Sequence, residues 1–258
     1  MLVRASAELV YEFAPQTQLL LSVQAAHSAD QLVKTETLQA TPAIAWMQDI
    51  DAVGHRQLRG VASGRTTITY EAVIDNGARM LLPARGEAHP WMELPADVLP
   101  YLLPSRFCPS DVFMRFADRT FGAAGDGVAK VMAVMDWIAE HVDYVPGSST
   151  ADHDAEHTFT LRAGVCRDFT HLGISLCRAL NIPARAVSAY ALNLEPPDFH
   201  AIMEVYLGGR WWLVDPTRLA PVEGIVRIGQ GRDAADIAFM TTDRACEMIS
   251  QQVAVAKA

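Results

Sequence analysis

The chain has 258 residues, of which 50% are hydrophobic and 20% are charged, a balance typical of a soluble globular protein. Its formal net charge is -9 and it has no run of lysine or arginine, which argues against binding to nucleic acid or to an anionic membrane by charge attraction alone. Glu8 and Glu12 interrupt the apolar opening, so it lacks the apolar core of a signal peptide, and no later segment approaches the roughly 18 apolar residues of a membrane span. We therefore expect a cytoplasmic protein of two domains.

Residues 1–105 carry short apolar segments that are typical of β-strands. The segment TTITYEAVI (66–74) is rich in β-branched residues and ends at the turn signal DNG. Several such segments, with polar turns and no helical period, predict a small β-rich N-terminal domain with an antiparallel sheet or sandwich. Residues 89–111 then contain five prolines, which no regular element can accommodate for long. We interpret this segment as the linker into a second domain, residues 106–258.

The second domain begins with helical patterns. Val128, Val131, Met132, Met135, Ile138 and Val142 follow one another at steps of three and four residues, with Asp126 as the expected N-cap. The polar segment 145–164 is predicted to be a loop, and a second helix is predicted over 165–181. Three strands are expected after it, over 184–192, 200–207 and 210–217. Helices followed by antiparallel strands indicate an α+β fold.

Four cysteines are present, and their spacing excludes a zinc knuckle and a thioredoxin motif because no CxxC pair occurs: Cys108, Cys166, Cys177 and Cys246. In a reducing cytosol we do not expect disulfides. Three of the four are interpreted as small buried hydrophobic residues. Cys166 differs, because it stands at the start of the second predicted helix, directly after Gly164 and Val165. It is either a packed core thiol or a nucleophile.

The predicted hairpin 200–217 places a histidine and an aspartate close together. If Gly208-Gly209 forms a two-residue turn, Ile202 lies opposite Asp215 on the neighbouring strand. Side chains alternate along a strand, so His200 and Ile202 share a face with Trp211 and Asp215. Asp215 is then the diagonal neighbour of His200, within reach of a carboxylate–imidazole hydrogen bond.

Cys166 has the surroundings that a nucleophile needs. A helix N-terminus carries partial positive charge and free N–H groups, which favour a thiolate and could stabilise an oxyanion through the N–H of Cys166 itself. Gly164 permits a tight backbone turn and a close approach of substrate. Thiol, imidazole and carboxylate would act in the order Cys166, His200, Asp215. Most chains of this length contain these residue types, so the prediction depends on their joint placement.

These segments resemble the bacterial transglutaminase-like superfamily, whose members are often described as cysteine proteases. The matching residues are GVCRDFTHLGISLCRALNIPARAVSAY, HAIMEVYLGGRWWLVDPT and IVRIGQGRDAADIAF. The resemblance implies a papain-like α+β core in which helices pack on an antiparallel sheet. It also implies a Cys-His-Asp triad at Cys166, His200 and Asp215. More loosely, residues 1–105 resemble the β-rich region that precedes this core in bacterial members.

One departure concerns the pocket for the acyl group. Family members commonly have tryptophan two residues after the histidine, where this chain has Ile202. We expect Gly164, Val165, Ile202 and Trp211 to line the cleft. Tyr144 lies where an upstream side chain in this superfamily can act as second oxyanion donor, so it is a candidate for that role; the alternative is a packing aromatic.

The other histidines and Asp168 are given structural roles. His153 and His157 have the i, i+4 spacing of helical zinc ligands, but the glutamate of HExxH is missing, so no metal is predicted. His171 is interpreted as a structural hydrogen-bonding residue. Asp168, in the first helical turn, is expected to cap the helix.

The sequence therefore predicts a cysteine-dependent amide-bond hydrolase, of peptidase or isopeptidase type, that works through a thioester on a peptide or protein substrate. It predicts neither a cofactor nor a metal, and nothing in it indicates an oligomer. Two alternatives remain open. One is a protein transglutaminase or deamidase with the same triad, and the other is a non-catalytic binding module that keeps the fold.

Overall fold

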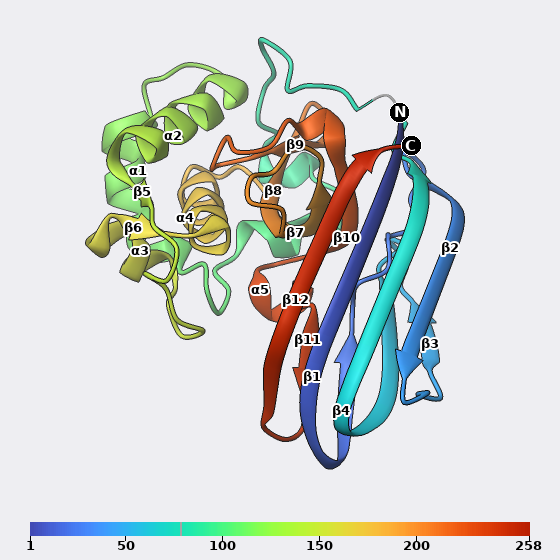
Figure 1. Cartoon of the computed structure of the whole chain (residues 1–258). Coiled ribbons are helices and arrows are strands. Elements are labelled where there is room, and N and C mark those ends of the chain that lie inside the picture. Colours follow the sequence, from blue (N-terminus) through green and yellow to red (C-terminus); the bar gives the residue numbers. More distant parts are fainter. Residues whose placement is uncertain (78) are drawn as a thin grey trace.

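The computed structural model describes residues 1–77 and 79–258 and contains a long-stranded sheet, a shorter sheet and a group of helices (Figure 1). The first sheet is antiparallel, with strand order β11-β1-β4-β2; β12 also pairs with β1, and β3 with β4. Its strands are β1 (Leu2–Leu21), β2 (Leu32–Thr41), β3 (Met47–Ile50), β4 (Arg56–Asp75), β11 (Met240–Thr242) and β12 (Cys246–Lys257). The β-rich character predicted for the N-terminal region is confirmed.

The strands of this sheet are longer than the sequence pattern suggested. Two separate apolar segments, 8–13 and 17–24, fall largely within the single strand β1. The pairing of β1 with β4 shifts register between Phe13 and Thr17, which is a bulge that interrupts the alternation. This interruption explains why one long strand resembles two short ones in the sequence.

The chain returns to the first sheet at its C-terminal end. We assigned all of residues 106–258 to the second domain, but β12 pairs with β1 along most of its length and β11 extends the same edge. Residues 240–257 therefore belong to the first sheet. The division of the chain at residue 105 itself stays a prediction. Since Val253 is the only buried residue of β12, the strand has little apolar alternation to reveal its partner.

The second sheet is also antiparallel and has the order β10-β7-β8-β9. Its strands are β7 (Ala184–Ala191), β8 (Phe199–Leu207), β9 (Arg210–Val214) and β10 (Ile225–Gly231). The hairpin register is the predicted one, with Leu207 opposite Arg210 and Val205 opposite Trp212. The three predicted strands are confirmed, and β10 is a fourth strand that we did not predict.

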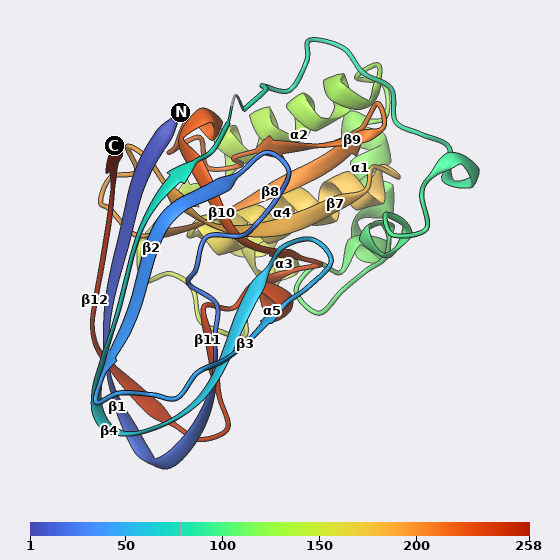
Figure 2. The ribbon, with the colours of Figure 1, turned by 90° about the vertical axis from the view of Figure 1, so that its right-hand side faces the viewer.

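The structure has five α-helices in its described residues, and four of them lie on the far side of the second sheet from the long strands (Figures 1 and 2), whereas the short helix Ala234–Ile237 contacts β10 and β7. They are α1 (Met114–Phe121), α2 (Gly127–His141), α3 (Ala155–Leu161), α4 (Cys166–Ala179) and α5 (Ala234–Ile237). As predicted, the Asp126 carboxylate caps α2 by accepting from the backbone N–H of Ala129 at 2.9 Å. The predicted core residue Met132 is instead 43% exposed. Within residues 1–77 and 79–258, no helix is long and apolar enough to cross a membrane.

Two further segments differ from the expectation. The predicted loop 145–164 contains α3, whose N-cap Asp154 accepts hydrogen bonds from two backbone N–H groups. The proline-rich segment forms the short 3-10 helices η1 (Trp91–Glu93), η2 (Leu99–Leu102) and η3 (Ser110–Phe113). A small parallel pair, β5 (Asp143–Tyr144) and β6 (Ala163–Gly164), joins the ends of the loop that contains α3.

Helix α4 is the centre of the larger core. Every residue from Asp168 to Ala179 is buried, and the helix packs against Met203 and Val205 of β8. Ile202 belongs to a separate apolar cluster with Leu213. Because neighbouring residues on a strand point to opposite faces, Ile202 faces away from α4. The predicted α+β architecture, with helices packed on an antiparallel sheet, is confirmed.

Candidate active site

The start of α4 is built around a buried carboxylate. Asp168 accepts a hydrogen bond from the backbone N–H of Val165 at 2.8 Å, which satisfies one of the N–H groups at the helix start. This is the capping role predicted for Asp168. A Cβ atom on Gly164 would lie only 2.7 Å from the Cβ of Asp168. Gly164 is therefore needed to make room for this carboxylate, a reason different from the close substrate approach that we expected.

The same carboxylate anchors the loop before α3. The hydroxyl of Ser149 donates to Asp168 at 2.8 Å, and Arg167 donates to both Ser149 and Asp168. Val165 and Cys166 remain half-buried at the open end of this arrangement. The nucleophile candidate is thus half-buried on a helix start that Asp168 ties to the neighbouring loop.

His200, at the beginning of β8, is held by Asp215, which follows the end of β9. The distance between His200 Nε2 and Asp215 Oδ2 is 3.0 Å, and both side chains are buried. Asp215 is oriented in turn by the backbone N–H and hydroxyl of Thr217, at 2.9 and 2.7 Å, and by the N–H of Ala220 at 3.0 Å. The hydrogen bond predicted from the hairpin register is present. The hydrogen bonds from Thr217 to the Asp215 carboxylate were not predicted from the sequence.

The imidazole of His200 interacts with both Asp215 and Cys166. Burial by itself would lower the pKa of His200, but hydrogen bonds to Asp215 and Cys166, with the charges of both, raise this pKa to about 9. Burial would raise the pKa of Asp215, but the hydrogen bond and charge of His200 hold it below its usual value. A protonated imidazole beside a cysteine is the counter-ion that a thiolate needs.

Tyr144 reaches the thiol because β5 pairs with β6, which places Tyr144 opposite Gly164. The phenol lies close enough to the backbone N–H and the thiol of Cys166 for both to act on its pKa. Burial and the charge of Cys166 raise the pKa of Tyr144 to about 12, so the hydroxyl stays protonated and can donate. The structure brings this oxyanion-donor candidate to the predicted position.

The structure does not bring two of the expected cleft residues to the thiol. Ile202 is fully buried in its apolar cluster and offers no surface to a substrate. Trp211 pairs with Tyr206, six residues along β8 from His200, or about 20 Å at roughly 3.3 Å per residue. The alternation correctly predicted the face of Trp211 but not its distance from the site. Both expectations are therefore corrected.

Asp198 is an acidic residue near the site that the sequence did not indicate. It is exposed, and its charge contributes to the raised pKa of Tyr144. Its Oδ1 atom accepts from the side chain of Gln251 at 2.6 Å. Because Gln251 lies on β12, the C-terminal strand of the first sheet contacts the loop that precedes His200. No local pattern in the sequence could have revealed this long-range contact.

His171 has the structural surroundings that we expected, whereas His157 lies in α3 and not in the predicted loop. Burial lowers the pKa of His171 to about 4, and its Nε2 accepts from the N–H of Ala234 at 3.2 Å, which confirms the structural interpretation. His153 and His157 stack at 4.9 Å, and His157 pairs with Asp154. In the described part of the chain, no group of three or more histidine, cysteine, aspartate or glutamate side chains is arranged to hold a metal ion.

The other cysteines have different environments from that of Cys166. Cys108 and Cys177 are fully buried, and burial raises the pKa of each thiol to about 12. These two are the packed core thiols that we predicted. Cys246, which we also expected to be buried, is instead half-buried on β12, where its sulfur lies 3.8 Å from the hydroxyl of Thr242.

The fold and this cluster of thiol, imidazole and carboxylate can be compared with known proteins. Residues 114–216 match the model of the transglutaminase-like superfamily, and this range contains the three predicted triad residues. A solved structure, that of a "Putative Cysteine Protease from Cytophaga hutchinsonii", is 38% identical and superposes with a TM-score of 0.92 over 99% of this chain and 90% of that one. The "Uncharacterized protein ML0607" of Mycobacterium leprae (strain TN) is 28% identical over 149 residues, 53% of this chain. The match spans about half of that relative, 52% of its length.

These matches define the class of cysteine-protease-like and transglutaminase-like proteins. The same matches indicate that the protein is an enzyme. The chain belongs to the transglutaminase-like superfamily.

Proposed function

We propose that this protein is a cysteine-dependent amide-bond hydrolase that acts on a peptide or protein. The observation that carries the proposal is the position of His200, which interacts with both Asp215 and Cys166 and has its pKa raised to about 9 by them. In an inactive member that keeps only the fold, nothing would require a buried imidazole to be held in this protonated state beside a half-buried thiol. The similarity to a solved protein described as a cysteine protease supports the same conclusion.

In the first step, the thiolate of Cys166 attacks the carbonyl carbon of the substrate amide, and a carbon–sulfur bond forms. The carbonyl oxygen becomes an oxyanion, which the backbone N–H of Cys166 and the hydroxyl of Tyr144 stabilise. In the free protein, Tyr144 already lies close enough to Cys166 for the backbone N–H and the thiol of Cys166 to act on the pKa of the phenol.

In the second step, the imidazolium of His200 gives its proton to the leaving nitrogen, the carbon–nitrogen bond breaks and a thioester remains. The neutral imidazole then takes a proton from water, which attacks the thioester and releases the acid. Asp215 holds the ring in place throughout and stabilises its charged form.

One observation favours an acyl transferase as the second candidate. The exposed carboxylate of Asp198 lies close enough to Tyr144 to influence its pKa. A negative charge beside the thioester would attract an ammonium group, and an amine that arrives there in place of water would make the reaction a transamidation. The chemistry at Cys166 would be the same, so the products distinguish the two reactions.

The first experiment measures alkylation of each cysteine by iodoacetamide near neutral pH, with mass spectrometry of the peptides. We expect Cys166 to react much faster than Cys246, a half-buried thiol that contacts no histidine among the described residues and serves as the matched control. Equal rates at the two cysteines would reject the activated nucleophile.

The second experiment screens a library of peptides and isopeptides, with ammonia release and amine incorporation measured in parallel. Cys166→Ala should abolish all turnover while the circular dichroism spectrum stays unchanged. Activity that survives this substitution would rule out the mechanism. A fast-reacting Cys166 with no turnover on any substrate class would favour the binding module.

A further inference from the structure

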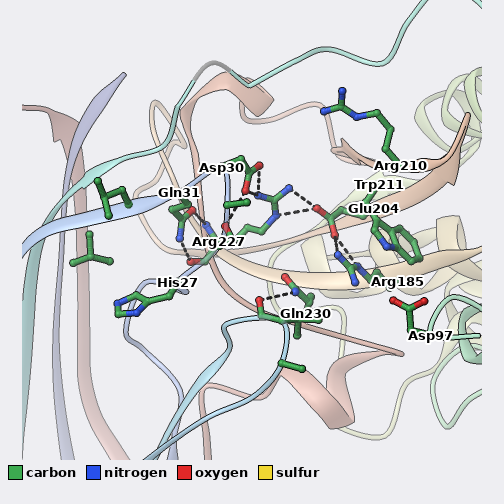
Figure 3. Close-up of a pocket in the computed structure, with 16 residues that line it drawn as sticks. His27, Asp30, Gln31, Asp97, Arg185, Glu204, Arg210, Trp211, Arg227 and Gln230 are labelled. Carbon is green, nitrogen blue, oxygen red and sulfur yellow. Dashed lines mark hydrogen bonds and ion pairs between the residues drawn. The ribbon is translucent and has the colours of Figure 1, made fainter. Parts of the chain in front are cut away.

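The middle of β8 is held by ion pairs on the face of the second sheet away from α4. Glu204 accepts hydrogen bonds from Arg185 of β7 at 2.7 Å and from Arg227 of β10 at 2.8 Å. Figure 3 shows Glu204 between these two arginines. Met203 and Val205 pack against α4, so Glu204, which lies between them on the strand, points the other way. These ion pairs fix β8 within its own sheet, and the distance from β8 to α4 depends on other contacts.

The start of β8 extends past the ladder that β9 provides. The hydrogen-bonded pairs of this hairpin recur at every second residue from the two-residue turn and include Met203 with Val214. By the same count, the next such pair is Ala201 with Pro216. Proline has no backbone N–H, so it cannot donate to the Ala201 carbonyl as a ladder partner would. Because Ala201 is buried, its carbonyl needs another donor.

Thr170 of α4 supplies that donor. Its hydroxyl donates to the Ala201 carbonyl at 3.0 Å, and both residues are buried. Residues four apart lie on the same face of a helix, so Thr170 stands one turn after Cys166 on the face that meets β8. Ala201 directly follows His200 on the strand. The hydrogen bond therefore joins the helix that carries the thiol to the strand that carries the imidazole.

The close approach of α4 to β8 continues beyond Thr170. One turn further along the helix, a Cβ atom on Gly173 would lie 3.0 Å from Met203 Sδ and 3.4 Å from Pro216 Cγ. Gly173 thus lets the helix approach the strand, and Thr170 extends the contact toward the thiol. A hydrogen bond restricts both distance and direction, which apolar contacts do not.

We propose that Thr170 is a positioning residue whose hydroxyl holds the start of β8 on α4 and so sets the distance between the Cys166 thiol and the His200 imidazole. The inference rests on the proposed function, because the thiolate–imidazolium pair is what Thr170 positions. The residue acts through the strand and takes no part in the bond changes. Pro216 makes this role necessary, since it removes the donor that would otherwise satisfy the Ala201 carbonyl.

The experiment compares Thr170→Val, which removes the hydroxyl and nearly keeps the shape, with Thr170→Ser, which keeps the hydroxyl. Two measurements need no substrate: the rate of Cys166 alkylation by iodoacetamide near neutral pH, and the NMR titration of His200. We expect Thr170→Val to lower the rate by about fivefold or more and the His200 pKa by at least about half a pH unit, because the imidazole loses contact with the thiolate. Thr170→Ser should react within about twofold of the unmodified protein, because its hydroxyl can make the same hydrogen bond.

The matched control is Ser175→Ala, which removes another buried hydroxyl of α4, one that donates to the His171 carbonyl at 2.8 Å. The control should lose some stability in urea but keep the alkylation rate and the His200 pKa of the unmodified protein. Thr170→Ala removes the same hydroxyl as Thr170→Val in the residue of highest helix propensity, and it serves as the test if Thr170→Val does not fold.

The proposal is overturned if the deletion of the Thr170 hydroxyl leaves either the rate or the pKa unchanged. It is also overturned if Ser175→Ala changes both as much, or if Thr170→Ser reacts as slowly as Thr170→Val. Failure of the proposed function has a different signature, since it already appears in the unmodified protein as equal alkylation of Cys166 and Cys246.

Discussion

The substitution Asp215→Asn removes the charge that orients His200 and leaves the shape of the side chain nearly unchanged. The pKa of His200 is raised from its ordinary value of 6.5 to about 9 against the effect of burial, and the Asp215 hydrogen bond is the largest contribution to the increase. The whole increase corresponds to about 3 kcal/mol at 1.36 kcal/mol per pH unit. We expect Asp215→Asn to lose at least about half of this increase in pKa, so the His200 imidazole of the variant should titrate below about pH 8.

The assay is an NMR titration of the His200 Cε1–H signal between pH 5 and pH 10. Asp198→Asn is the matched control, because it removes a nearby exposed carboxylate that does not contact the imidazole. The control should titrate within a few tenths of a pH unit of the unmodified protein. If Asp215→Asn also does so, the carboxylate does not set the charge of His200, and the argument for the triad geometry is refuted.

Protein stability provides an independent readout of the same shift. The folded-state pKa of His200 lies above the unfolded value, so its stabilising contribution is complete below about pH 6.5 and is lost as the pH rises through about 9. From pH 6 to pH 10, the unfolding free energy of the unmodified protein should fall by up to about 3 kcal/mol from this group. Asp215→Asn should show at most about half of this fall in urea titrations at each pH.

Three other substitutions test separate parts of the structure. Gly164→Ala would place Cβ 2.7 Å from that of Asp168, so we expect a loss of about 1–3 kcal/mol in thermal unfolding; an unchanged Tm would contradict the steric account. Glu204→Gln leaves two buried arginines short of a counter-charge and should cost about 3–5 kcal/mol in denaturant unfolding, whereas a loss under 1 kcal/mol would show the ion pairs to be dispensable. Tyr144→Phe should lower kcat by on the order of 100-fold with little change in KM, and equal kcat values would remove the hydroxyl from the mechanism.

The parts of the site that could be predicted from the sequence are those in which local geometry determines distance. A two-residue turn sets the pairing of β8 and β9, so the contact between His200 and Asp215 could be obtained by counting along the hairpin. The position of Cys166 at a helix start followed in the same way from the apolar period of α4. Trp211 shows the limit, because alternation determines the face of a side chain and carries no information about its distance from the thiol.

The parts that could not be predicted depend on contacts between distant segments. Tyr144 approaches Cys166 only because β5 pairs with β6 across the loop that contains α3. Asp198 meets Gln251 only because β12 returns to the first sheet. Such pairings follow from the free energy of the whole fold, and the exposed residues of β12 give no local signal of them.

By itself, the sequence determined the α+β class, the helix that presents Cys166 and the hairpin that joins His200 to Asp215, since each follows from a short-range period or turn. Only the tertiary structure decided which residues surround the thiol and which leave it. It placed Trp211 opposite Tyr206, far along β8 from His200, and brought Tyr144 next to Cys166. The physical reason is that the period of an element specifies which way its side chains point, whereas the packing of whole sheets and helices specifies what those side chains meet.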